Sequence, residues 1–112
     1  MFKEKECLAF REAIEKKHEV DLLSKSRKTE QSALKSAFIA AAMRELKPTT
    51  IGLARVMGIN HATVIHHHRN HKYNYCDMET DYNKLYVFWY NRFEADAKNY
   101  EEVVAEYEGV SV

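Results

Sequence analysis

The segment spanning residues 49–72 constrains the fold of this chain more than any other stretch. It places a small residue, Ala54, four positions before Gly58, and a β-branched residue, Val64, six positions after that glycine. Glycine adopts the left-handed backbone that ends a helix without steric cost, and alanine allows two helices to cross closely. This spacing is typical of a DNA-binding helix-turn-helix. The alternative is an ordinary helical hairpin.

Residues flanking the glycine predict where the two helices begin. The hydroxyl of Thr49 or Thr50 can accept a hydrogen bond from a backbone N–H at the start of the first helix, and Pro48 keeps the preceding chain out of that helix. Asn60 can cap the second helix in the same way. We therefore expect a helix, a tight turn at Gly58, and a recognition helix capped by Asn60.

Composition extends this prediction to the whole chain. With 112 residues, one proline and three glycines, the chain has few helix breakers, so we expect one all-α domain of about five to six helices. No apolar run approaches the ~18 residues that a membrane helix requires, and the charged N-terminus does not resemble a secretion signal. We therefore expect a cytoplasmic protein in which Cys7 and Cys76 are reduced thiols.

Four segments are expected along the chain. They are an N-terminal helix within 1–20, a DNA-binding core at 21–72 with a helix at 30–46, an aromatic helix at 78–98 and an acidic tail at 99–112. Residues 73–77 are expected to form a looser stretch. The tail should be partly helical and fray at Gly109.

The zero net charge of the chain conceals an uneven distribution. Residues 22–72 carry nine Lys or Arg against two acids, a surplus of seven positive charges. Residues 73–112 carry three bases against nine acids, a surplus of six negative charges. Because the positive surplus coincides with the helix-turn-helix, it favours contact with a phosphate backbone. Two oppositely charged, solvated faces are the alternative.

Two stretches of the basic region resemble a known family. The first is Asp21-Leu22-Leu23-Ser24-Lys25-Ser26-Arg27-Lys28, and the second is Arg44-Glu45-Leu46 followed by the helix-turn-helix that ends Asn60-His61-Ala62-Thr63-Val64-Ile65-His66. Together they are similar to the C-terminal DNA-binding domain of DnaA, the bacterial chromosomal replication initiator, over about residues 19–72. The resemblance implies a DnaA-like, Trp-repressor-like bundle that binds double-stranded DNA in the nucleoid.

The chain has no glycine-rich phosphate loop of the Gly-x-x-x-x-Gly-Lys-Ser/Thr kind. It therefore cannot switch with ATP as an initiator does. A stand-alone DNA-binding domain would suit a small phage or prophage protein that acts in replication control or transcription regulation.

The resemblance also implies which residues contact bases. In that family the recognition helix begins Asp-His-Thr-Thr, and these side chains read base edges in the major groove. His61 and Thr63 match the motif, whereas Asn60 takes the place of the aspartate and Ala62 that of the first threonine. We expect these four residues and His66 to contact bases.

Backbone contacts are expected from the basic loop and from both helices of the motif. They are Ser24, Lys25, Arg27, Lys28, Lys35, Thr49, Thr50, Arg69 and Asn70. The family's minor-groove arginine has no aligned counterpart here, and Lys35 and Arg27 are the two candidates to replace it. Residues placed 100° apart on the recognition helix give an outward set of Ala62, Thr63, His66, Arg69 and Asn70, and an inward set of Val64, Ile65, His68, His71, Lys72 and Tyr75.

The histidine-rich run invites a metal or catalytic interpretation, which the spacing does not favour. Only His67 and His71 are four residues apart, and a structural zinc needs four converging ligands. His68 and His71 are interpreted instead as partly buried core residues. No nucleophile–base pair has a recognisable setting, so we expect no enzyme activity, no cofactor and no metal.

The aromatic helix leaves two roles open. Tyr82, Leu85, Tyr86, Trp89 and Phe93 recur every three or four residues, which predicts a core stripe. Phe88 and Tyr90 lie off that stripe and suggest a homodimer or partner contact. The rival function is therefore a non-catalytic protein-interaction module that docks a replication or host protein through this helix.

Overall fold

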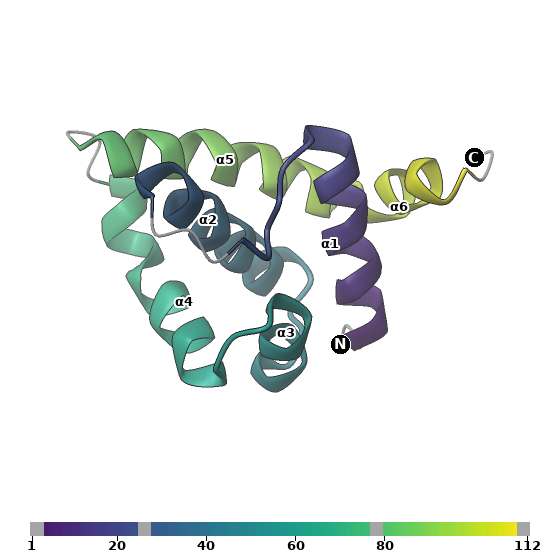
Figure 1. Ribbon diagram of the computed structural model, residues 1–112, viewed down its shortest axis with the longest axis horizontal. Coiled ribbons are helices and arrows are strands. Elements are labelled where there is room, and N and C mark those ends of the chain that lie inside the picture. The colour runs from purple at the N-terminus through teal and green to yellow at the C-terminus, as the bar shows by residue number, and fades with distance from the viewer. Residues whose placement is uncertain (1–3, 25–27, 77–79, 110–112) are drawn as a thin grey trace.

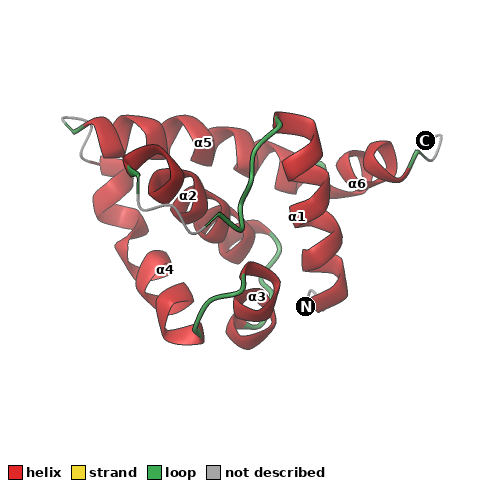
Figure 2. Ribbon diagram, viewed as in Figure 1, coloured by secondary structure: helices red, strands yellow, loops and turns green. Residues whose placement is uncertain are grey.

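The computed structural model describes residues 4–24, 28–76 and 80–109, apart from the side chains of residues 70 and 72–76. Within these ranges the chain forms six α-helices and no strand, which confirms the all-α prediction (Figure 1, Figure 2). The helices are α1 (Glu4–His18), α2 (Thr29–Glu45), α3 (Thr50–Met57), α4 (His61–Cys76), α5 (Asp81–Lys98) and α6 (Tyr100–Glu108). None of them is both long and apolar enough to cross a bilayer.

Helix α2 is the centre of the core. Its alanines are buried, and their small side chains let α4 and α5 pack closely against it. The ring of Phe38 stacks on Phe10 of α1 at a centroid distance of 5.6 Å and meets the edge of Phe93 of α5 at 6.0 Å. Helices α1, α2 and α5 therefore share one aromatic core.

The aromatic stripe of α5 packs into this core, as predicted. Tyr86 and Phe93 are fully buried. The other three residues of the stripe pack against the same cluster and remain partly accessible: Tyr82, Leu85 and Trp89. The prediction that Tyr90 lies off the stripe was wrong. Tyr90 is buried because α4 packs beside α2 on α5, and the ring of His71 lies 4.4 Å from the Tyr90 ring.

Helices α1 and α6 form the other end of the molecule. Helix α6 packs on α1, and the Tyr107 hydroxyl donates to the Glu12 carboxylate at 2.9 Å. The buried carboxylate of Asp96 on α5 contacts the Lys17 ammonium at 2.5 Å and the His18 ring at 2.7 Å. These bonds fix the C-terminal end of α1 on α5. The tail is helical from Tyr100 to Glu108, as expected, and Gly109 ends α6 in a left-handed conformation.

Two further expectations have clear outcomes. Cys7 is a buried, reduced thiol, and burial raises its pKa to about 11; the Cys76 side chain lies outside the described residues. The prediction of a looser stretch from residue 73 was wrong, because α4 continues to Cys76. No glycine or proline follows Gly58 before that point, so nothing in the sequence interrupts the helix.

Candidate nucleic-acid interface

The turn between α3 and α4 has the capping residues that the sequence predicts. Thr49 Oγ accepts from the Gly52 N–H at 3.0 Å, and Asn60 Oδ1 accepts from the Ala62 N–H at 2.8 Å. Gly58 ends α3 with a left-handed φ of 65°. Each helix end is therefore closed locally, and the short turn fixes the direction in which α4 leaves α3.

Packing across the turn holds the two helices together. Val64 is 0% exposed and belongs to the same buried cluster as Leu53 and Ala54 of α3. The side chain of Val64 thus takes the place expected of the apolar wedge of a helix-turn-helix. Ala54 leaves room for this close approach because it carries only a methyl group.

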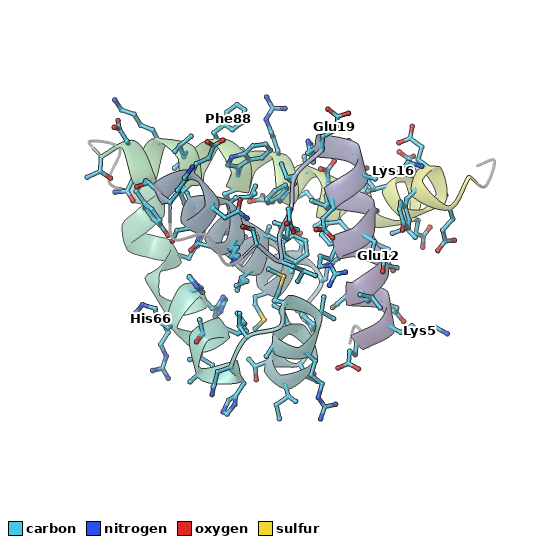
Figure 3. All side chains as sticks on the ribbon, viewed as in Figure 1. Lys5, Glu12, Lys16, Glu19, His66 and Phe88 are labelled. Atoms are coloured by element: carbon cyan, nitrogen blue, oxygen red, sulfur yellow. The ribbon has the colours of Figure 1, made fainter. Side chains whose placement is uncertain are left out.

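The outer face of the first two turns of α4 is accessible to solvent. Asn60, at the cap, is exposed, and so are the other four side chains expected to read bases, namely His61, Ala62, Thr63 and His66. In Figure 3 the labelled His66 projects away from the body of the molecule. All five candidates are therefore exposed at the cap and in the first two turns of α4.

The inner face of α4 carries two hydrogen-bonded histidines. His67 Nδ1 lies 2.7 Å from Ser36 Oγ of α2, and that oxygen accepts from the Tyr82 hydroxyl of α5 at 2.8 Å. One turn later, His71 Nδ1 contacts the Tyr86 hydroxyl of α5. The prediction that His68 faces inward was wrong, because His67 is the half-buried residue and His68 is exposed.

The surroundings of these two rings disfavour protonation. Burial lowers the pKa of His67, and the neighbouring His66 and Lys35 lower it further. Burial also lowers the pKa of His71, with Arg44 and His68 acting in the same direction and Glu94 opposing them. Both rings are therefore held neutral to lower pH than an exposed histidine.

The expected backbone contacts are spread over several surfaces. Lys35 of α2 is half-buried and close enough to His67 of α4 to lower its pKa. Thr49 and Arg69 are exposed, and Thr50 is half-buried. Lys28 instead lines a hollow with Asp21 and Trp89, at a surface shared by the end of α1, α2 and α5.

Other candidates in this set are less well defined. Ser24 is half-buried, while Lys25, Arg27 and the Asn70 side chain lie outside the described residues. Sequence reasoning gave no role to Arg55, whose side chain is 73% exposed on α3. Its spacing of four residues from Ile51, which is also exposed, is the signal that could have placed it on the outer face of α3.

The acidic helix α6 is remote from α4. The glutamates of α6 lie at the opposite end of the molecule from α4 in Figure 1. Among the described residues, no three His, Cys, Asp or Glu side chains converge as metal ligands would.

Comparisons with protein-family models, curated proteins and solved structures find no match for this chain.

Proposed function

We propose that this chain binds double-stranded DNA with sequence preference through α3 and α4, without catalysis. The observation that carries the proposal is the contrast between an inner face of α4 fixed by packing and an outer face that presents polar side chains beside the turn. A recognition helix needs both properties, because its position must be defined while its outer side chains enter the groove.

The outer side chains suit the major groove. The ring nitrogens of His61 and the hydroxyl of Thr63 offer donors and acceptors to base edges, and the methyl of Ala62 suits a thymine methyl group. The Asn60 carbonyl oxygen is engaged by the Ala62 N–H. Asn60 would therefore present amide donors to the groove, where an aspartate would present only acceptors.

Cations flank this surface at positions suited to phosphates. Lys35 of α2 is close enough to His67 of α4 to lower its pKa, and Arg69 is exposed on α4. Arg55 is exposed on α3, where its guanidinium lies 3.7 Å from the Glu4 carboxylate of α1. The Thr49 hydroxyl accepts from the backbone and keeps its proton to donate to a phosphate oxygen. We propose a DnaA-like mode of docking on these grounds, in replication control or transcription regulation of a phage-like or nucleoid-associated system.

Salt dependence provides the first test. Fluorescence anisotropy with a mixed-sequence duplex should show that affinity falls steeply between about 50 and 200 mM salt, because bound Lys and Arg release counterions from the DNA. A matched single strand of the same length should bind more weakly, since α4 is shaped for a duplex groove. A Kd that is independent of salt, or absence of duplex binding, would overturn the proposal.

The rival function rests on one exposed side chain. Phe88 on α5 is 48% exposed, and the Arg92 guanidinium lies 4.2 Å from its ring centroid; in Figure 3 Phe88 points away from the body. The aromatic stripe itself packs in the core. Docking of a partner protein or a second copy through Phe88 would be lost in Phe88→Ala and insensitive to salt, which separates this alternative from DNA binding.

A further inference from the structure

The two inward histidines of α4 tie this helix to two different neighbours. His67 meets Ser36 of α2, and His71 meets Tyr86 of α5. The two histidines are four residues apart, so they lie one above the other on one face of the helix. The proposed base and phosphate contacts do not use either ring. Their geometry therefore points to a role in holding α4.

The hydrogen bond from Tyr82 favours one direction for the bond between Ser36 and His67. The Tyr82 hydroxyl donates to Ser36 Oγ at 2.8 Å, which leaves the Ser36 proton for His67 Nδ1, 2.7 Å away. This arrangement requires an unprotonated Nδ1. In an imidazolium, Nδ1 carries a proton, so His67 and Tyr82 would both donate to Ser36 and the serine proton would lose its acceptor.

The groups around His67 make the protonated form still less favourable. Lys35 approaches from α2 and His66 from α4, and both add positive charge beside the ring. Ser36 and Tyr82 are the uncharged groups that face it from α2 and α5. No acidic side chain contributes to the shift at His67, whose pKa is lowered mainly by burial.

We infer the same arrangement at His71. Burial raises the pKa of the Tyr86 phenol, so this hydroxyl keeps its proton and can donate it to an unprotonated His71 Nδ1. Tyr90 of α5 packs on the His71 ring. Arg44 of α2 and His68 of α4 disfavour a positive charge there, whereas Glu94 of α5 favours it. A protonated His71 would take away the acceptor of the Tyr86 hydroxyl.

We propose that His67 and His71 are positioning residues that hold α4 only in their neutral form, so that proton uptake by the pair releases α4 from α2 and α5 and weakens DNA binding. The weakening of DNA binding rests on the function proposed above, whereas the release of α4 does not. Mildly acidic solution would thus act on the same helix that reads the DNA.

Amide hydrogen exchange tests the release without DNA. Between about pH 7.5 and about pH 5, exchange of α4 amides, corrected for intrinsic rates, should rise at least about tenfold more than exchange of α1 amides. In the double variant His67→Asn/His71→Asn this difference should disappear, because an asparagine carbonyl can accept at the Nδ1 position but does not titrate. His68→Asn, an exposed neighbour, is the matched control and should behave like the natural chain.

DNA affinity over the same pH range tests the consequence. We expect the Kd of the natural chain for a mixed-sequence duplex at constant ionic strength to rise about tenfold toward pH 5, and that of the double variant to stay level or fall. Protonation of exposed histidines alone would strengthen binding to phosphates, so the sign of the change distinguishes the two effects. Binding that strengthens in acid in the natural chain would overturn the DNA half of the inference.

The outcomes separate the inference from the function. If no duplex binds at any pH, the proposed function fails, and the exchange data still decide whether α4 is released. Equal exchange of α4 and α1 amides in acid, or an unchanged acid response in the double variant, overturns the inference. Should circular dichroism show the double variant unfolded, Ser36→Ala replaces it: α4 exchange should already be raised at neutral pH and respond less to acid.

Discussion

The two faces of α4 differ in what engages their side chains. On the inner face, Val64 is buried and His67 and His71 are hydrogen-bonded to neighbouring helices. On the outer face, His61 and Thr63 are exposed beside the turn. The comparison teaches that the residues that hold α4 in the fold are not the residues that we propose for DNA contact. Substitutions on the outer face should therefore leave stability nearly unchanged.

The largest expected effect is the loss of stability when α5 loses a side chain that packs on the inner face of α4. Tyr86 is fully buried and contacts His71, so Tyr86→Ala should lower the free energy of unfolding by about 3–5 kcal/mol, as for other large aromatic truncations. Urea denaturation followed by circular dichroism measures this. Phe88→Ala on the exposed side of α5 is the control, and we expect it to stay within about 0.5 kcal/mol. Equal losses in the two variants would contradict the assignment of the core.

The next effect is on binding by the outer face. His61→Ala and Thr63→Ala should each weaken binding to a selected site by about 1–3 kcal/mol and leave binding to scrambled duplex nearly unchanged. Both residues are exposed, so the melting temperature should hardly move. Competition binding with selected and scrambled duplexes measures the difference. Uniform weakening on every sequence would mean that these residues contact the backbone rather than bases.

The inner face should also make stability depend on pH. The pKa values of His67 and His71 are lowered in the folded chain, so the unfolded chain takes up protons first as the pH falls below about 6.5. The stabilisation is thus fully present above that pH and is lost progressively below it. Denaturation midpoints in urea across this range measure the loss. In the His67→Asn/His71→Asn variant, stability should depend less on pH. If its stability changes with pH as it does in the natural chain, the two histidines are not the cause of the change.

The smallest expected effect is on the salt dependence of DNA affinity when one lysine near α4 is removed. Lys35→Ala should lower DNA affinity equally for all sequences and reduce the slope of log Kd against log salt by about one. Lys84→Ala, at an exposed position on α5, is the matched loss of one charge and should leave the slope unchanged. A slope that changes equally in both variants would indicate an effect of net charge alone.

The helix ends of the motif were predictable because their signals are local. Thr49, Gly58 and Asn60 act on backbone groups within a few residues of themselves, and all three take the expected conformations. The small size of Ala54 and the burial of Val64 follow from the same spacing. Sequence alone was sufficient for these features.

The orientation of α4 about its own axis was less predictable. His66, His67 and His68 are chemically identical, so the sequence does not show which of them turns inward. Ser36, which lies 31 positions earlier in the chain, selects His67 through its hydrogen bond. The burial of Tyr90 has a similar cause, because it depends on two helices packing on α5. Such features arise from tertiary contacts that one helical pattern does not encode.

The central claim is that the outer face of α4 reads DNA sequence. Selection from a random duplex pool, run in parallel with the natural chain and with His61→Ala, tests it most directly. We predict that the natural chain enriches one motif, and that His61→Ala enriches the same motif with base preference lost at one position. No enriched motif with the natural chain, or an identical motif with undiminished preference at every position in the variant, would contradict the account.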